Sequence, residues 1–238
     1  MTLTDLLVHE MVVDWGLNRR LVTTRRGETV FECVVRPAQG IHYVTECLPQ
    51  RQNSAEHLAR ALNYLGQQGI TDVIVVHPET WDVAGTDCGR IVPMWLRLDP
   101  EMIASFERVL PIGYQVEPYS DDVPQDRSVF EEIGRGQYGP LIPEASLRIV
   151  ADGRTRGAIA VTEDRGVPLI GHLVVEEAKR GAGLGRTLLV RGLLGLADAG
   201  YVDCRLNVMA GNFAARRLYR SIGFVQDRAT LKASRVTS

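Results

Sequence analysis

Three closely spaced glycines form the stretch of this sequence with the clearest chemical potential. In AKRGAGLGRTLLV, Gly181, Gly183 and Gly185 stand between an apolar run typical of a strand and a leucine-rich run typical of a helix. Glycines ahead of a helix let several backbone N–H groups converge, and the helix N-terminus adds partial positive charge. Such a loop can hold a phosphate, and Lys179 and Arg186 add charge beside it. The same spacing would also serve a tight turn without a ligand.

The loop departs from two well-known nucleotide motifs. A P-loop requires lysine after its last glycine, and Arg186 stands there instead. A dinucleotide fingerprint requires G-x-G-x-x-G, whereas this loop reads G-x-G-x-G. The glycines alone therefore leave the ligand open.

A second segment indicates which ligand the glycine loop binds. LNVMAGNFAARRLYRSIGF (206–224) combines a strand-like start with Asn212, Ala215, Tyr219 and a final Gly-Phe pair. An apolar strand, then Arg180 opening the pattern R-x-x-G-x-G, then L-x-V-x-x-x-N-x-x-A-x-x-L-Y-x-x-x-G-F resembles the GNAT superfamily of acyl-CoA-dependent N-acyltransferases. The resemblance covers roughly residues 113–233.

The resemblance implies that acetyl-CoA (coenzyme A) is the cofactor. Its pyrophosphate would lie on the glycine loop and the helix N-terminus, and its pantetheine arm would pair with the preceding strand like an added strand. The strand over 203–208 would splay away to leave that gap. The implied cofactor-binding residues are Leu173, Val174, Val175, Arg180, Gly181, Ala182, Gly183, Leu184, Gly185, Arg186, Asn212, Ala215 and Tyr219.

The implied reaction is direct attack of a primary amine on the thioester carbon in a ternary complex. A backbone N–H near Val175 would stabilise the oxyanion. Tyr219 would act as general acid toward the thiolate, since a phenol with a reference pKa of about 10 matches a thiol of comparable basicity. The alternative for Tyr219 is a core aromatic, and Asn212 could serve only as a helix cap.

Two residues are candidates for the general base. His172, on the strand before the glycine loop, has a side chain suited to proton transfer near neutral pH. Glu176 is the second candidate, and Glu177 stands where the family often has proline. That departure leaves the base unassigned between them, and His172 could also be purely structural.

Alternative functions remain open at this stage. The chain could transfer another acyl or aminoacyl group, or it could be a non-catalytic acetyl-CoA-binding or sensor module. The predicted acceptor is a small-molecule or peptide amine, and a homodimer is left open. Acidic residues over 120–139 could attract a cationic amine or could form a solvated helix face.

The predicted order of strands and helices around these residues indicates an α/β (α+β) protein. We expect a mixed, mostly antiparallel central sheet with flanking helices, GNAT-like and built of two similar halves. Residues 58–76 align without gaps with residues 189–207, and both read as helix, glycine stop and buried strand. The loop glycines have no counterpart in PQRQNS (49–54), so we expect domain 1–111 to be a degenerate GNAT-like or accessory copy and 112–238 to be the catalytic domain.

Three local predictions accompany this division of the chain. Residues 4–15 are expected to form a helix, and residues 224–233 a single last strand. Within a strand over 90–98, Pro93 is expected to mark an edge or a bulge.

Composition argues against nucleic-acid binding, membrane association and a metal site. A formal net charge of -2 over 238 residues gives no reason to expect nucleic-acid binding. No apolar run is long enough for a membrane helix, and neither the four cysteines nor the five histidines show metal-ligand spacing. We therefore expect a cytoplasmic protein with no metal site, no nucleic-acid partner and no membrane association.

Overall fold

The chain divides into two compact units. A computed structural model describes residues 6–11, 19–25, 28–38, 41–49, 54–120, 138–164, 166–228 and 230–237. Unit 1 comprises Met1–Ile91 and Arg228–Ser238, and unit 2 comprises Val92–Asp227. The chain thus passes between the units after residue 91, within a strand, and again after residue 227, whereas the expected domain boundary lies at residue 111.

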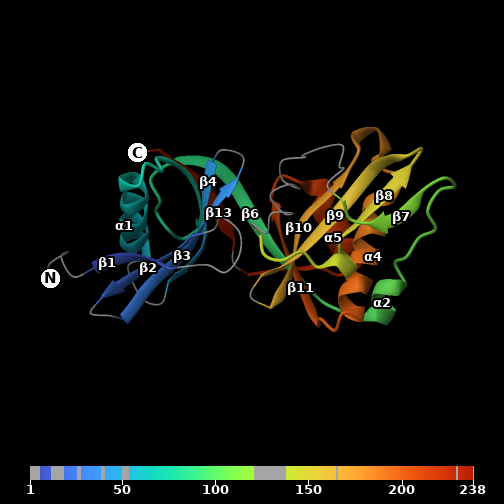
Figure 1. The fold of residues 1–238 in the computed structure, drawn as a ribbon, viewed down its shortest axis with the longest axis horizontal. Helices are drawn as coiled ribbons and strands as arrows, with labels where there is room; N and C mark the ends of the chain where they lie inside the picture. The colour runs from blue at the N-terminus through green and yellow to red at the C-terminus, as the bar shows by residue number, and fades with distance from the viewer. Residues whose placement is uncertain are drawn as a thin grey trace. The chain divides into compact units, whose positions relative to one another are not determined.

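Unit 1 is a sheet with one helix against it (Figure 1). Its strands run in the order β1-β2-β3-β4-β5-β13-β6, and helix α1 contacts β1, β2 and β3. Leu58 and Leu65 of α1 pack on Phe31 and Val75 in its core. The elements are β1 (Leu6–Met11), β2 (Arg19–Arg25), β3 (Glu28–Ala38), β4 (Ile41–Pro49), α1 (Ser54–Gln67), β5 (Asp72–Pro78), the first part of β6 (Thr86–Arg97) and β13 (Leu231–Thr237).

Unit 2 carries the two motifs. Its strands run in the order β6-β11-β10-β9-β8-β7, with β12 also on β6. Helix α4 packs against β8, β9 and β10, and Leu188 and Leu193 of α4 share a core with Ile149 and Ile159. The elements are the rest of β6, α2 (Pro100–Ala104), β7 (Gln115–Pro118), the 3-10 turn η2 (Pro143–Ala145), β8 (Leu147–Ala151), β9 (Arg154–Asp164), β10 (Val167–Val175), the 3-10 turn η3 (Glu177–Lys179), α4 (Leu184–Asp198), β11 (Asp203–Met209), α5 (Phe213–Ile222) and β12 (Val225–Gln226).

These sheets confirm the predicted fold class. Most neighbouring strands are antiparallel, and the parallel pairs β4–β5 and β10–β11 are each joined by a helix. This is the arrangement that a strand–helix–strand crossover requires.

The internal repeat has a structural counterpart. In unit 1, the N–H of Ile70 donates to the carbonyl of Leu65 at 3.0 Å, and Gly69 has a φ of 79°. In unit 2, the N–H of Tyr201 donates to the carbonyl of Leu196 at 3.1 Å, and Gly200 has a φ of 88°. The aligned residues therefore end α1 and α4 with the same left-handed cap, which turns the chain back into the next strand.

The predicted helix over 4–15 is wrong where the structure describes it. Residues 6–11 form strand β1, which pairs antiparallel with β2 from Leu6↔Arg25 to Met11↔Arg20. Val8 packs against the core of unit 1. Pairing with a neighbouring strand thus overrode the local helix signal, as tertiary context often does.

The predicted last strand is really two strands in different units. Val225 and Gln226 pair with Trp95 and Met94 of β6, whereas Leu231–Thr237 lies between β5 and β6 in unit 1. Pro93 separates the part of β6 that pairs with β13 from the part that pairs with β12. Because proline has no N–H to donate, it suits this point of partner exchange.

Strand β13 should hold the sheet of unit 1 together. Ala233 lies opposite Val76 of β5 and Gly89 of β6, and only 5% of its surface is exposed. We expect Ala233→Pro to destabilise unit 1 by roughly 1–3 kcal/mol, because proline removes a buried ladder hydrogen bond. Amide hydrogen exchange should show faster exchange in β5 and unchanged protection in α4. Ala233→Ser keeps the N–H and serves as control; equal protection in both variants would contradict this role.

Candidate functional site

The central feature of unit 2 is a gap between two parallel strands. β10 and β11 pair only at Leu169↔Arg205 and Ile170↔Leu206. The register between β10 and β9 shifts directly afterwards, between Ile170 and His172, as at a β-bulge. A bulge bends its strand, so the last part of β10 stays on β9 and parts from β11. The expected splaying of the strands is therefore present.

The backbone beyond this point presents hydrogen-bonding groups toward the gap. The N–H of Glu176 donates to the carbonyl of Arg156 at 2.8 Å, on the β9 side. Because the polar groups of successive strand residues point to opposite sides, those of Val175 and Leu173 face away from β9. The side chains of both residues pack on the main core, whereas Val174 packs on the other face of the sheet.

The glycine loop joins this strand to α4. Gly181 and Gly183 have φ values of 84° and 85°, a conformation that favours glycine over all other residues. Gly183 occupies the N-cap position of α4, and no side chain caps the helix there. The first N–H groups of a helix have no partner within it, so this end can accept an anion.

Gly185 brings the neighbouring elements together at the same end. A Cβ on this residue would lie 3.5 Å from Cγ2 of Val175 and 3.7 Å from Cδ2 of Leu218. The end of β10, the start of α4 and the middle of α5 thus converge on one point. The residues of the two sequence motifs, separated along the chain, meet there.

Two arginines of the loop are held by hydrogen bonds. Nε of Arg180 donates to the carbonyl of Val175 at 3.3 Å, and Nη2 of Arg186 donates to Oγ of Ser221 at 2.7 Å. The second bond links α4 to α5. Ser221 was not singled out in the sequence, because a serine on a helix surface carries no distinctive signal.

Asn212 caps the N-terminus of helix α5. The side chain of Asn212 accepts a hydrogen bond from the N–H of Ala215 at 3.1 Å, and Gly223 ends the helix with a φ of 106°. Capping therefore accounts for this asparagine, and a contact of Asn212 with the cofactor stays a prediction.

Tyr219 of α5 is a buried tyrosine with a strongly perturbed pKa. It is 8% exposed, and its ring lies 5.7 Å from that of Phe224. Burial raises the pKa of Tyr219 to about 12, because the apolar surroundings disfavour the phenolate. The phenol consequently stays protonated at neutral pH, which a proton donor requires.

The two candidate bases have different surroundings. Glu176 forms an ion pair with Nη1 of Arg156 at 2.8 Å, and the Arg156 side chain is only 14% exposed. This bond also raises the pKa of Arg156. His172 is half-buried on β10 opposite Ala160, and strand alternation places it on the face of Val174. No sequence pattern pointed to Arg156, which reaches Glu176 only through the pairing of β9 with β10.

Part of the predicted acceptor wall lies outside the described residues, which omit 121–137. Among the residues that are described, no cluster of three or more His, Cys, Asp or Glu side chains could hold a metal ion. Within the same residues, no helix combines the length and apolar character needed to span a membrane.

The comparison with family models adds the decisive observation. Residues 136–237 match the model described as an acetyltransferase (GNAT) domain. The chain contains a GNAT domain. This match includes both the glycine loop and the Asn212–Phe224 segment, so the family resemblance is confirmed for this part of the chain.

Solved structures with the same fold extend over both units. A GCN5-related N-acetyltransferase from Sphaerobacter thermophilus is 18% identical with a TM-score of 0.65, over 92% of this chain and 80% of that one. A tandem GNAT protein from the clavulanic acid biosynthesis pathway is 16% identical with a TM-score of 0.65, over 95% and 84%. A putative acetyltransferase from Pyrococcus horikoshii is 14% identical with a TM-score of 0.56, over 92% and 73%. Curated protein sequences provide no match.

The cap of α5 gives a stability test. We expect Asn212→Ala to lower the free energy of unfolding of unit 2 by about 1 kcal/mol, because an N–H of the first turn loses its acceptor. Urea denaturation followed by circular dichroism measures this. Asn212→Asp should keep the wild-type stability, since its carboxylate can accept the same bond; equal stability of the alanine variant would contradict the capping role.

Proposed function

We propose that this chain transfers an acetyl group from acetyl-CoA to a primary amine. The observation that carries the proposal is the gap between β10 and β11, which leads directly to the uncapped N-terminus of α4. A GNAT domain supports acyl-CoA-dependent N-acetyl transfer in general. The donor, the acceptor class and the residue roles are our proposals.

The residues of this site fit coenzyme A. The outward-facing backbone of Leu173 and Val175 can pair with the pantetheine arm as an added strand. The N–H groups from Gly181 to Arg186, together with the guanidinium of Arg180, can hold the pyrophosphate at the helix N-terminus. Acetyl-CoA supplies the activated acyl group when it is bound.

The residues around the gap then have distinct tasks. His172 takes one proton from the substrate ammonium, so that the amine nitrogen can attack the carbonyl carbon. The N–H of Val175 stabilises the negative charge that develops on the carbonyl oxygen. As the C–N bond forms and the C–S bond breaks, Tyr219 gives its proton to the thiolate. The second proton lost from nitrogen restores the phenol, so protons balance.

The ion pair with Arg156 supports His172 over Glu176 as the base. The Glu176 carboxylate is held at 2.8 Å by Nη1 of Arg156, a residue of β9, so this ion pair would have to break before Glu176 could contact an acceptor amine. We therefore assign base catalysis to His172. Glu176 is assigned a positioning role, in which it ties the end of β10 to β9.

The proposed pyrophosphate site at the N-terminus of α4 can be tested by introducing a negative charge there. We expect Gly183→Asp to raise the Kd for coenzyme A by more than about 100-fold, because a carboxylate would occupy the anion position. Any side chain is strained at the φ of 85° that Gly183 adopts, so circular dichroism of the variant must first show that α4 is still folded. Isothermal titration calorimetry measures the Kd.

Gly200→Asp is the matched control for this variant. It adds the same charge at a glycine of almost the same φ, 88° against 85°, at the other end of α4. Binding should be unaffected by this control. Normal coenzyme A binding by Gly183→Asp would contradict the assignment of the loop.

The acid role of Tyr219 can be tested by kinetics. We expect Tyr219→Phe to lower kcat by roughly 100-fold or more, with little change in the Kd for acetyl-CoA, because only the transferred proton is lost. Thiol release measured against a panel of primary amines gives kcat. Tyr201→Phe is the control: its hydroxyl donates to Glu163 at 2.5 Å, away from the gap. An unchanged kcat would remove Tyr219 from the mechanism, and binding without thiol release from any amine would contradict transfer itself.

A further inference from the structure

Unit 1 contains a cavity that the proposed reaction does not use. The cavity has a volume of about 350 Å³ and lies between helix α1 and the segment 82–84. A volume of this size suits a small organic molecule. Its lining among the described residues consists of Leu58, Ala59, Leu62, Asn63, Gly66, Ile70, Val73, Asp82, Val83, Ala84 and Val236.

Most of the cavity wall is apolar. Leu58 and Leu62 come from one face of α1, and Val73 and Val236 come from neighbouring strands of the sheet. Gly66 lies in the same helix, where glycine is less favourable than alanine. Since Gly66 lines the cavity, its missing side chain leaves that space open.

Two polar side chains complete the lining. Asn63 and Asp82 are both exposed, and within the described part of the chain neither has a hydrogen-bond or ion-pair partner. Asp82 is the single charged residue of this lining. The cavity thus offers an apolar wall, one carboxylate and one amide, a combination complementary to an amine with an apolar body.

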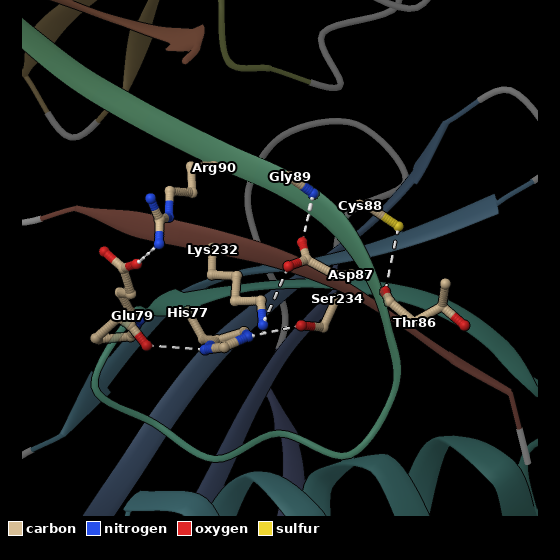
Figure 2. A network of polar contacts seen from close by, with 10 residues as sticks. His77, Glu79, Thr86, Asp87, Cys88, Gly89, Arg90, Lys232 and Ser234 are labelled. Atoms are coloured by element: carbon tan, nitrogen blue, oxygen red, sulfur yellow. Dashed lines mark hydrogen bonds and ion pairs between the residues drawn. The ribbon is translucent and has the colours of Figure 1, made fainter. Parts of the chain in front are cut away.

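Residues 82–84, which line the cavity opposite α1, belong to a segment that is held at both ends. At its start, the N–H of Glu79 donates to the carbonyl of Thr230 at 3.1 Å. The side chain of Glu79 also forms an ion pair with Arg90 at 2.6 Å (Figure 2). At its end, Gly85 approaches the backbone so closely that a Cβ would lie 2.5 Å from the carbonyl oxygen of Arg235. Only glycine fits this contact, so residues 82–84 are held in place.

Polar contacts, of which the one between His77 and Ser234 is buried, connect the strands next to this segment. Nε2 of His77 lies 3.0 Å from Oγ of Ser234, and Nδ1 lies 2.9 Å from the carbonyl oxygen of Pro78 (Figure 2). Asp87 accepts from the N–H of Gly89 at 2.7 Å and pairs with Lys232 at 3.3 Å. These contacts join β5, β6 and β13 around the segment, which makes the cavity a preformed one.

The cavity follows from a difference between the two units. In unit 2, β11 is followed by helix α5, which lies beside α4. In unit 1, the corresponding strand β5 is followed by residues 79–85, which form no helix. Unit 1 therefore has no counterpart of α5 among residues 79–85, and the cavity lies along the side of α1 that such a helix would cover.

We propose that this cavity is a binding site for a small monoamine. The apolar body of the ligand lies against Leu58, Leu62 and Val236, and its ammonium group pairs with Asp82 and Asn63. This site is distinct from the proposed acetyl-transfer site and does not depend on acetyl transfer.

The test uses the full chain and two probes of nearly the same shape. 2-Phenylethylamine is titrated without coenzyme A and followed by the methyl NMR signals of Val73, Val83 and Val236. We expect these signals to shift, with 2-phenylethanol binding about tenfold more weakly because it lacks the charge. Asp82→Asn should remove the preference for the amine, while Glu56→Gln, at an exposed residue of α1 outside the lining, should keep it.

Two further variants test the location. Gly66→Leu and Ala59→Leu place bulk in the cavity and should abolish binding of both probes, whereas Gln67→Leu, on the next residue of α1, should not. Either filling variant suffices if the other fails to fold. The proposal is overturned if the three methyl signals do not shift, if the alcohol binds as well as the amine, or if a second copy of the chain rather than the probe covers these residues.

Discussion

The site of this protein depends on where two parallel strands stop pairing. β10 and β11 share a register for only two residues, and the last part of β10 then continues on β9 alone. A strand with one open side inside a sheet has backbone N–H and C=O groups without a strand partner, which a ligand or a side chain can satisfy, as Arg180 does for the carbonyl of Val175. The chain places a helix N-terminus at the end of this open side, so backbone groups that a ligand can satisfy lie in sequence from Leu173 to Arg186.

The surrounding contacts hold this opening in place. Arg156 ties Glu176 to β9, Arg180 reaches the carbonyl of Val175, and Arg186 reaches Ser221 on α5. These bonds fix the end of β10, the glycine loop and the two helices relative to one another. Tyr219 is then held in an apolar environment, and the same burial that packs its ring keeps its phenol protonated.

The two units show how one supersecondary plan can lead to different surfaces. Both contain a parallel strand–helix–strand crossover, and α1 and α4 end with the same cap. The sequence before α1 lacks the loop glycines, and no helix follows β5. Unit 1 therefore has an apolar cavity beside α1, whereas unit 2 has a helix beside α4 and a phosphate-type loop.

The local features of the site could be predicted from residue type and spacing. The glycine spacing, the Asn212 cap, the stop at Gly223 and the aligned helix–glycine–strand segments follow from residue type and short-range geometry, and each has its counterpart in the structure. The roles proposed for His172, Glu176 and Tyr219 rest on the family resemblance and stay predictions.

Features that depend on partners far along the chain could be seen only in the folded protein. Residues 6–11 became a strand because β2 pairs with them, and residues 224–233 were divided because β6 takes one part and the sheet of unit 1 takes the other. The Arg156–Glu176 pair, the Arg186–Ser221 bond and the cavity beside α1 likewise join residues with no shared local pattern. Local sequence sets backbone preference within a few residues, but long-range pairing and burial select among the conformations that it allows.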